Sequence, residues 1–244
     1  MKVLAKERLI FALDVDSFVE AEQWVRQLHG QVGLFKVGKQ LFTRCGPQVV
    51  DMVRREGGSV FLDLKYHDIP NTVAMATVEA CRLGVRMVNV HALGGREMMA
   101  RTVAEVDRIA PRGSAERPLL LAVTILTSST ETTLKEIGID RAVREMVPRL
   151  ARLAQEAGMD GVVASPQEVD LIRAACGPDF AIVTPGVRPG FASLDDQKRV
   201  ATPGEAISAG ADYLVIGRPI SAAADPVAAA ALILDEMSAA LQAR

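Results

Sequence analysis

The stretch SVFLDLKYHDIPNTVAMATVEACRLGVRMVNVH, residues 59–91, contains one complete strand–helix–strand unit. Residues 59–64 and 86–91 are short apolar runs rich in β-branched side chains, a pattern typical of strands. Residues 72–83 between them have helical spacing, and Gly84 supplies the stop signal of a helix. This segment therefore predicts two strands joined by a helix.

The same alternation recurs along the whole chain. Further strand-like runs lie at residues 8–13, 33–37, 119–124, 161–164, 181–184 and 213–216. Further helical spacing lies at residues 17–28, 47–56, 141–157 and 225–241. Eight strands alternating with helices predict an α/β fold, a (β/α)8 TIM barrel, with residues 1–244 as a single domain. The main alternative is an open doubly wound sheet, although no GxGxxG motif follows the first predicted strand.

The composition argues against several classes of partner. The chain has 28 basic and 30 acidic residues and a net charge of -2, which disfavours a general binder of nucleic acid or membrane surfaces. Its three cysteines form no CxxC cluster and fit reduced thiols in the cytosol. The first eight residues are too charged for a signal peptide, and we expect no run of membrane-spanning length. The sequence thus predicts a cytoplasmic protein.

Charged residues gather where several predicted strands end. Active sites of TIM barrels lie at the C-terminal ends of their strands. Asp63 and Lys65 are two positions apart, so a regular strand points both toward the same side. Asp14 and Lys36 bring the same two signs from the first and second strands, and Asp68 adds a further carboxylate. A surface ion pair would explain one Asp-x-Lys, but an alternating array is costly unless a ligand uses it.

A second candidate site follows the last two predicted strands, where barrel enzymes often bind phosphate. Residues 185–188, PGVR, and residues 217–218, GR, combine glycine with arginine. Glycine lets the backbone approach an anion, and arginine binds phosphate through two parallel hydrogen bonds. The turn-rich segment 186–196 is a candidate mobile lid over this site.

These motifs resemble the orotidine 5'-monophosphate decarboxylase family. The resemblance rests on residues 63–72 (DLKYHDIPNT), 11–14 (FALD), 35–38 (FKVG), 126–128 (LTS), 184–188 (TPGVR) and 216–218 (IGR). It covers nearly the whole chain in the same order. It implies that orotidine 5'-monophosphate loses carbon dioxide to give uridine 5'-monophosphate, the last step of pyrimidine nucleotide synthesis, without a metal or an organic cofactor.

The resemblance also implies roles for the residues of the charged array. Lys65 would deliver a proton to C6 of the pyrimidine as carbon dioxide leaves, and Asp63 would lie beside the substrate carboxylate. Lys36 and Asp14 would contact the ribose hydroxyls and complete the array. Asp68 would belong to the catalytic set, but it would reach the site from the neighbouring subunit of a homodimer.

The remaining implied roles concern the other parts of the nucleotide. Thr127 would face the edge of the pyrimidine, and Thr72 would join from the partner chain near the ribose. The phosphate would be bound by Arg188, Gln197, Gly217 and Arg218. Among these residues, the assignment of Gln197 depends on aligning a loop of variable length.

Two other functions remain to be weighed. Metal-dependent sugar-phosphate decarboxylases and aldolases share the Asp-x-Lys-x-x-Asp pattern, but they need an acidic group where this chain has the cation Lys36. A non-catalytic nucleotide-binding barrel is disfavoured by the intact set of Asp63, Lys65 and Asp68. His91, at a strand end, is interpreted as a supporting histidine, and Lys39 as a solvated residue at a helix start.

Overall fold

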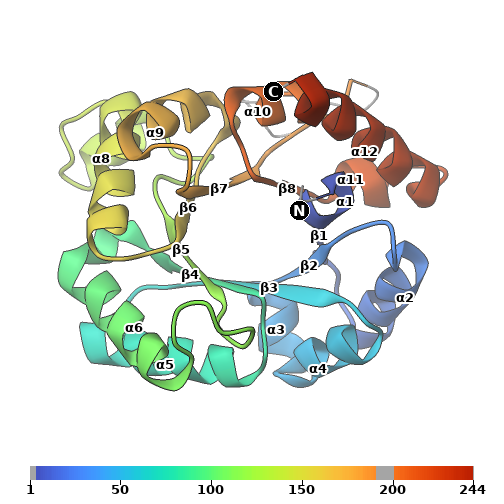
Figure 1. Cartoon of the computed structure of the whole chain (residues 1–244), viewed down its shortest axis with the longest axis horizontal. Helices are drawn as coiled ribbons and strands as arrows, with labels where there is room; N and C mark the ends of the chain where they lie inside the picture. The colour runs from blue at the N-terminus through green and yellow to red at the C-terminus, as the bar shows by residue number, and fades with distance from the viewer. Residues whose placement is uncertain (1–3, 191–200, 244) are drawn as a thin grey trace.

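A computed structural model describes residues 4–190 and 201–243, and it contains a closed barrel of parallel strands surrounded by helices (Figure 1). The strands are β1 (Leu9–Ala12), β2 (Leu34–Gly38), β3 (Ser59–Tyr66), β4 (Met87–His91), β5 (Leu119–Val123), β6 (Gly161–Val163), β7 (Ala181–Pro185) and β8 (Tyr213–Ile216). They follow one another in chain order, and β8 pairs with β1 to close the barrel. This confirms the predicted TIM barrel and excludes the open doubly wound sheet. That residues 1–244 form one domain stays a prediction, because some of them lie outside the described ranges.

Helices cover the outside of the barrel. The described helices are α1 (Ala5–Arg8), α2 (Phe18–Leu28), α3 (Lys39–Cys45), α4 (Gln48–Arg55), α5 (Pro70–Arg82), α6 (Gly95–Ile109), α7 (Glu131–Glu136), α8 (Val143–Glu156), α9 (Val169–Cys176), α10 (Pro203–Ala209), α11 (Arg218–Ser221) and α12 (Pro226–Ala243), with short 3-10 turns at Ala92–Gly94 and Pro166–Glu168. The apolar spacing predicts neither α6 nor α9. In α6, Thr102 and Glu105 lie on the buried face and weaken the apolar pattern.

Strand alternation separates the hydrophobic residues into two layers. One set of side chains fills the barrel interior, and its members include Ile10, Leu34 and Phe61. The other set, which includes Phe11 and Phe35, packs between the strands and the helices. Because side chains alternate along a strand, Lys36 shares the inward face with Leu34, and Asp63 shares it with Phe61. The fold therefore directs these two charged residues toward the barrel axis, above the apolar interior.

Helix α12 corrects the expectation that the sequence contains no apolar run of membrane-spanning length. Among the described residues it is the one helix that is long and apolar enough to cross a membrane, with a mean hydropathy of 1.2 over 18 residues. In the fold it packs against α10 and α11, and it buries Ala229, Ala230, Ile233 and Met237. A helix that covers the core of a protein can be as long and as apolar as a membrane-spanning helix.

Candidate functional site

Four charged side chains of alternating sign form a continuous array at the C-terminal ends of β1, β2 and β3. Lys36 Nζ lies 2.9 Å from Asp14 Oδ1 and 3.6 Å from Asp63 Oδ2. Lys65 Nζ lies 2.6 Å from Asp63 Oδ1. This geometry confirms the prediction that Asp14, Lys36, Asp63 and Lys65 meet at one end of the barrel. Asp63 stands at the centre of the array, between two cations.

Burial differs along the array. The side chains of Asp63 and Lys36 are 11% and 12% exposed, that of Lys65 is 24% exposed, and that of Asp14 is 68% exposed. A buried charge that loses its partner is strongly destabilising, so the inner members depend on one another. Gly38 leaves room for this packing, since an added Cβ there would lie 3.2 Å from Lys36 Nζ. The ammonium group of Lys65 is paired and still reaches the solvent-accessible side of the array.

The backbone at Lys65 does not follow the regular strand that the sequence analysis assumed. Lys65 has φ 51°, and the pairing of β3 with β4 shifts register between Leu62 and Tyr66. A residue other than glycine in this left-handed region is uncommon and strained. The expected Asp63–Lys65 pair is present, but regular alternation is the wrong reason for it. An irregular strand end brings the two side chains together.

A cavity of about 170 Å³ adjoins the array. Lys36, Asp63 and Lys65 line one part of it, and the half-buried Thr127 lines another. The rest of the lining is mainly apolar: Phe61, Val123, Ile125, Leu126, Val163, Ala164, Pro185 and Val215. Fixed charges beside an apolar wall interact more strongly than they would in water. The cavity is therefore suited to a reaction in which charge moves close to Lys65.

The predicted phosphate residues follow adjacent strands at the same end of the barrel. β7 and β8 pair through Pro185 and Val215, and Arg188 and Arg218 follow those strands closely. Arg188 is buried and its backbone N–H donates to the carbonyl of Ala201, whereas Arg218 is exposed at the start of α11. Gly217 packs tightly, because an added Cβ would lie 3.2 Å from Ala12 Cβ. Gln197 lies outside the described residues, as does the proposed lid from residue 191 onward.

The two residues assigned to a partner subunit lie on an exposed part of this chain. Asp68 is exposed and its Oδ1 accepts a hydrogen bond of 2.6 Å from the backbone N–H of Ile69. Thr72 is exposed in the first turn of α5. Within residues 4–190 and 201–243, the ion pairs of the array include neither residue. The structure of one chain therefore does not bring Asp68 or Thr72 into its own array.

His91 ends β4 beside the array. Burial, followed by electrostatic repulsion from His67, lowers its pKa to about 4, and the two imidazole centroids are 5.6 Å apart. His91 is therefore neutral at pH 7. Lys39 is exposed at the first position of α3, as predicted. Over the part of the chain that the structure describes, no three His, Cys, Asp or Glu side chains are grouped so that they would hold a metal ion.

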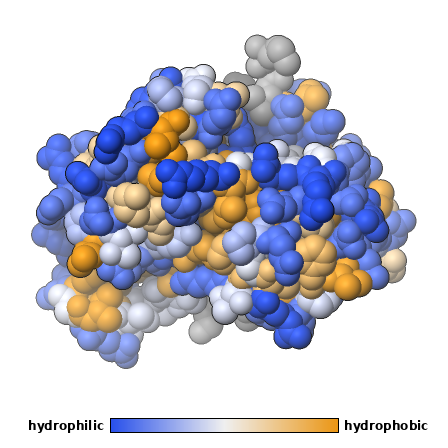
Figure 2. All heavy atoms as spheres, turned by 90° about the horizontal axis from the view of Figure 1, so that it is seen from below, coloured by the Kyte–Doolittle hydropathy of each residue, from blue (hydrophilic) through white to orange (hydrophobic). Residues whose placement is uncertain are grey.

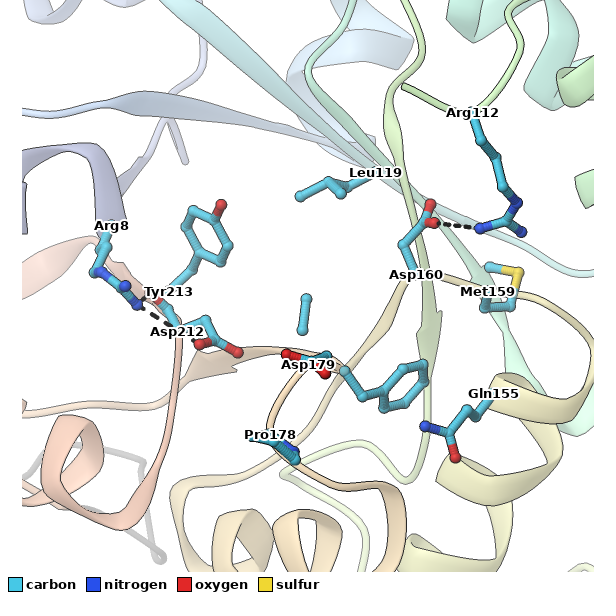
Figure 3. A pocket seen from close by; sticks show the side chains of 12 residues that line it. Arg8, Arg112, Leu119, Gln155, Met159, Asp160, Pro178, Asp179, Asp212 and Tyr213 are labelled. Carbon is cyan, nitrogen blue, oxygen red and sulfur yellow. Dashed lines mark hydrogen bonds and ion pairs between the residues drawn. The ribbon is translucent and has the colours of Figure 1, made fainter. Parts of the chain in front are cut away.

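A larger cavity, of about 490 Å³, lies at the opposite end of the barrel (Figure 3). Leu119 and Tyr213 point toward the middle of the barrel, and charged pairs stand around them. Arg8 pairs with Asp212 and Arg112 with Asp160, at 3.6 Å and 3.2 Å. Asp160 also accepts a hydrogen bond from the backbone N–H of Leu120. These charges hold the ends of strands together, and this end is not the catalytic end of a TIM barrel.

Comparisons with known proteins show which family this chain resembles. Residues 7–233 match the model of a family described as "Orotidine 5'-phosphate decarboxylase / HUMPS family". Orotidine 5'-phosphate decarboxylase of Syntrophotalea carbinolica is 68% identical, over 99% of both chains. The enzyme of the same name from Geobacter sulfurreducens is 64% identical, over 96% of this chain and 98% of its own. The crystal structure of orotidine 5'-phosphate decarboxylase from Lactobacillus acidophilus superposes with a TM-score of 0.83 at 38% identity, over 94% of this chain and 98% of the other.

Proposed function

This chain belongs to the orotidine 5'-phosphate decarboxylase / HUMPS family, and from that premise we propose how its site carries out the family's decarboxylation. The enzyme is a carboxy-lyase that converts orotidine 5'-monophosphate to uridine 5'-monophosphate in pyrimidine synthesis. The observation that carries the proposal is the contact of 2.6 Å between Lys65 Nζ and the buried carboxylate of Asp63, at the edge of the cavity.

Lys65 acts as the proton donor. The bond from C6 to the carboxylate carbon breaks, carbon dioxide leaves, and the electron pair stays on C6. That pair lies in the plane of the ring, where the π system does not delocalise it, so its charge needs a fixed cation nearby. The ammonium group of Lys65 attracts the developing charge, transfers a proton to C6, and recovers its proton from solvent.

Asp63 makes the site complementary to the reaction's change of charge. It lies beside the substrate carboxylate, whose negative charge disappears as carbon dioxide forms, so repulsion is greater before the reaction than after it. Lys36 Nζ lies 3.6 Å from the other oxygen of Asp63 and thereby helps to orient this carboxylate. The apolar wall around Val123 and Val163 accepts the neutral carbon dioxide more readily than the carboxylate from which it forms.

Residues further from C6 supply binding energy. Enzymatic rate enhancements reach about 10¹⁷, or roughly 23 kcal/mol, which exceeds what a single lysine contributes. We assign the phosphate to Arg188, Gln197, Gly217 and Arg218, the pyrimidine edge to Thr127, and the ribose to Asp14 and Lys36. Contacts with the remote phosphate hold the ring in place against the array, so that binding energy lowers the barrier at C6.

The functional unit is a homodimer in which Asp68 and Thr72 complete the site of the other subunit. Exposed apolar side chains at the C-terminal ends of three consecutive strands support this: Ile69 is 67%, Leu93 39% and Leu126 41% exposed. Figure 2, which shows the side of α3 to α6, also has hydrophobic residues among the charged ones near the middle of that face. Apolar surface of this kind marks interfaces.

Shared sites predict complementation between two inactive variants. A Lys65→Ala subunit and an Asp68→Ala subunit, unfolded and refolded together, form mixed dimers in which one site contains both defects and the other contains none. We expect such a mixture to regain about a quarter of wild-type activity, because half of randomly formed dimers are mixed. A mixture with no more activity than either variant alone would contradict shared sites.

The chemistry of the array disfavours the metal-dependent alternative. Lys36 occupies the place where those enzymes need an acidic ligand, and its cation repels a metal ion from that position. The proposed reaction uses no metal and no organic cofactor, and no nucleic-acid or membrane partner. We place the enzyme in the cytoplasm, where cysteines remain reduced; Cys45, Cys81 and Cys176 are free thiols.

The direct test follows the ultraviolet absorbance of orotidine 5'-monophosphate during incubation with the purified enzyme and excess EDTA. We expect conversion to uridine 5'-monophosphate at the same rate with and without the chelator. Absence of conversion under both conditions would contradict the decarboxylase function. Conversion that EDTA abolishes and Mg²⁺ restores would instead favour the metal-dependent chemistry.

A further inference from the structure

Asn89 is a buried polar residue within an apolar strand. It lies in β4 between Val88 and Val90, and its side chain is fully excluded from solvent. Val88 and Val90 belong to the outer layer, whereas Asn89 shares the inward face with Met87. Burying an amide is unfavourable unless its hydrogen bonds are made. The contacts of Asn89 therefore decide why an amide occupies this position.

Both ends of the Asn89 amide contact the charged array. Its Oδ1 accepts a 2.8 Å hydrogen bond from the backbone N–H of Lys65, and its Nδ2 donates a 2.7 Å hydrogen bond to Asp63 Oδ1. A backbone N–H can only donate, so Oδ1 must face Lys65, and Nδ2 is left to face the carboxylate of Asp63. One rigid group thus links the main chain at Lys65 to the side chain of Asp63.

The contact with the main chain lies at the irregular part of β3. β3 advances from Leu62 to Tyr66 while β4 advances only from Val88 to Val90. At this shift, the N–H of Lys65 donates to the Asn89 side chain, at a residue whose φ of 51° is unfavourable for lysine. A strained conformation persists where surrounding contacts enforce it, and Asn89 supplies such a contact from the neighbouring strand.

We propose that Asn89 is a positioning residue, which holds the backbone of Lys65 and the carboxylate of Asp63 so that the ammonium group points at the reacting carbon. This inference rests on the proposed decarboxylation. The two hydrogen bonds of Asn89 connect it to Lys65 and Asp63, and neither involves a residue that is assigned to the phosphate. Its loss displaces the proton donor while leaving the groups that bind the rest of the nucleotide in place.

Two substitutions separate the two contacts. Asn89→Leu is similar in size and removes both, whereas Asn89→Asp retains an acceptor for the N–H of Lys65 and places a second negative oxygen against Asp63. Thr124→Val is the matched control: Thr124 is buried directly after the neighbouring strand, and its Oγ1 donates to the backbone carbonyl of Val163 rather than to a member of the array.

We expect Asn89→Leu to lower kcat about 100-fold, as displacement of a catalytic group by roughly 1 Å does. KM for orotidine 5'-monophosphate and Kd for uridine 5'-monophosphate should change less than about threefold, because uniform binding is retained. Asn89→Asp should lose at least about tenfold in kcat. Thr124→Val should keep kcat within about twofold, although its hydrogen bond is also buried.

Other results would overturn the inference. These are wild-type kcat in Asn89→Asp, weakening of product binding by the same factor as kcat, or an equal loss of kcat in Thr124→Val. If Asn89→Leu does not fold, the kcat of Asn89→Asp decides whether Asn89 is a positioning residue. A crystal structure of either variant tests the geometry independently of turnover: Lys65 should leave φ 51° or move away from Asp63. An unchanged array would refute positioning by Asn89, whereas an inactive wild-type protein would refute the decarboxylase function.

Discussion

At the N-terminal end of the barrel, Asp160 accepts hydrogen bonds from Arg117 and from the backbone N–H of Leu120. At the C-terminal end, Asp63 accepts hydrogen bonds from Lys65 and Asn89, and it borders a cavity. At both ends, cations surround a carboxylate with little exposure, 13% for the side chain of Asp160 and 11% for that of Asp63. The cations differ in kind, however, because the first network uses arginine and the second uses lysine.

The difference in cation matches a difference in task. Arginine stays protonated and makes several directed hydrogen bonds, which suits Arg173 where it donates to the carbonyls of Gly177, Phe180 and Gly210 as well as pairing with Asp212. Lysine is a compact charge that is able to release a proton. One end of the barrel uses ion pairs to hold strands together, and the other retains an ammonium group that can take part in a reaction.

The largest expected effect follows from removing that ammonium group. Lys65→Ala should lower kcat by about 10⁴-fold or more, because both the proton donor and the cation are lost. Lys65→Arg should be similarly inactive, since a guanidinium retains the charge but does not give up its proton. The assay is loss of orotidine 5'-monophosphate absorbance, with circular dichroism to check folding. Lys39→Ala, at the exposed start of α3, is the matched control, and activity within tenfold of wild type in either Lys65 variant would refute the assigned role.

A smaller effect, on stability rather than rate, is expected at the other end. The side chain of Arg117 is 6% exposed and pairs with Asp107 and Asp160 at 2.7 Å each. Arg117→Ala leaves those carboxylates without this partner and should lower the free energy of unfolding by about 3 kcal/mol, while kcat at 25 °C is unchanged. Urea denaturation measures the first quantity. The control Arg108→Ala removes an arginine that is 76% exposed, and its partner Glu105 keeps an ion pair with Arg101, so stability should shift by less than about 1 kcal/mol. An equal loss in both variants would contradict the structural role of Arg117.

The smallest expected effect concerns pH. Burial lowers the pKa of His91 from 6.5 to about 4, so between these values the unfolded chain binds a proton that the folded chain excludes. The free energy of unfolding therefore keeps its full value above pH 6.5, where His91 is neutral in both states, and it decreases as the pH falls toward 4. His91→Asn should therefore reduce the fall in unfolding free energy between pH 6.5 and 4, measured by urea titration. A pH dependence identical to that of wild type would show that His91 does not contribute.

The sequence predicts most of the barrel and much of the array because the signals are local. Gly84 follows a helix-like run, and the structure ends α5 at Arg82, two residues earlier. The ends of strands are likewise visible as changes from apolar to charged residues. The sequence alone therefore identifies Asp14, Lys36, Asp63 and Lys65 as candidates for the site. Helix α6 is not predicted from the sequence, because polar residues occupy part of its buried face.

The role of Asn89 is not predictable from the sequence, for a different reason. An asparagine in an apolar strand indicates a buried hydrogen bond, but its partners come from β3, 24 and 26 positions away along the chain. The irregular backbone at Lys65 is equally hidden, because lysine carries no local preference for positive φ. Regular alternation predicts the right pair from a conformation that the strand does not adopt.

The amino-acid sequence alone determined which charges stand at the strand ends and in what order, since short-range periodicity and strand termination are encoded by neighbouring residues. Tertiary structure decided which of those charges touch, how deeply each is buried and what holds Lys65 in its unusual conformation. Closing the barrel sets the register of adjacent strands, and that register, rather than any local preference, brings Asn89 against Lys65 and Asp63.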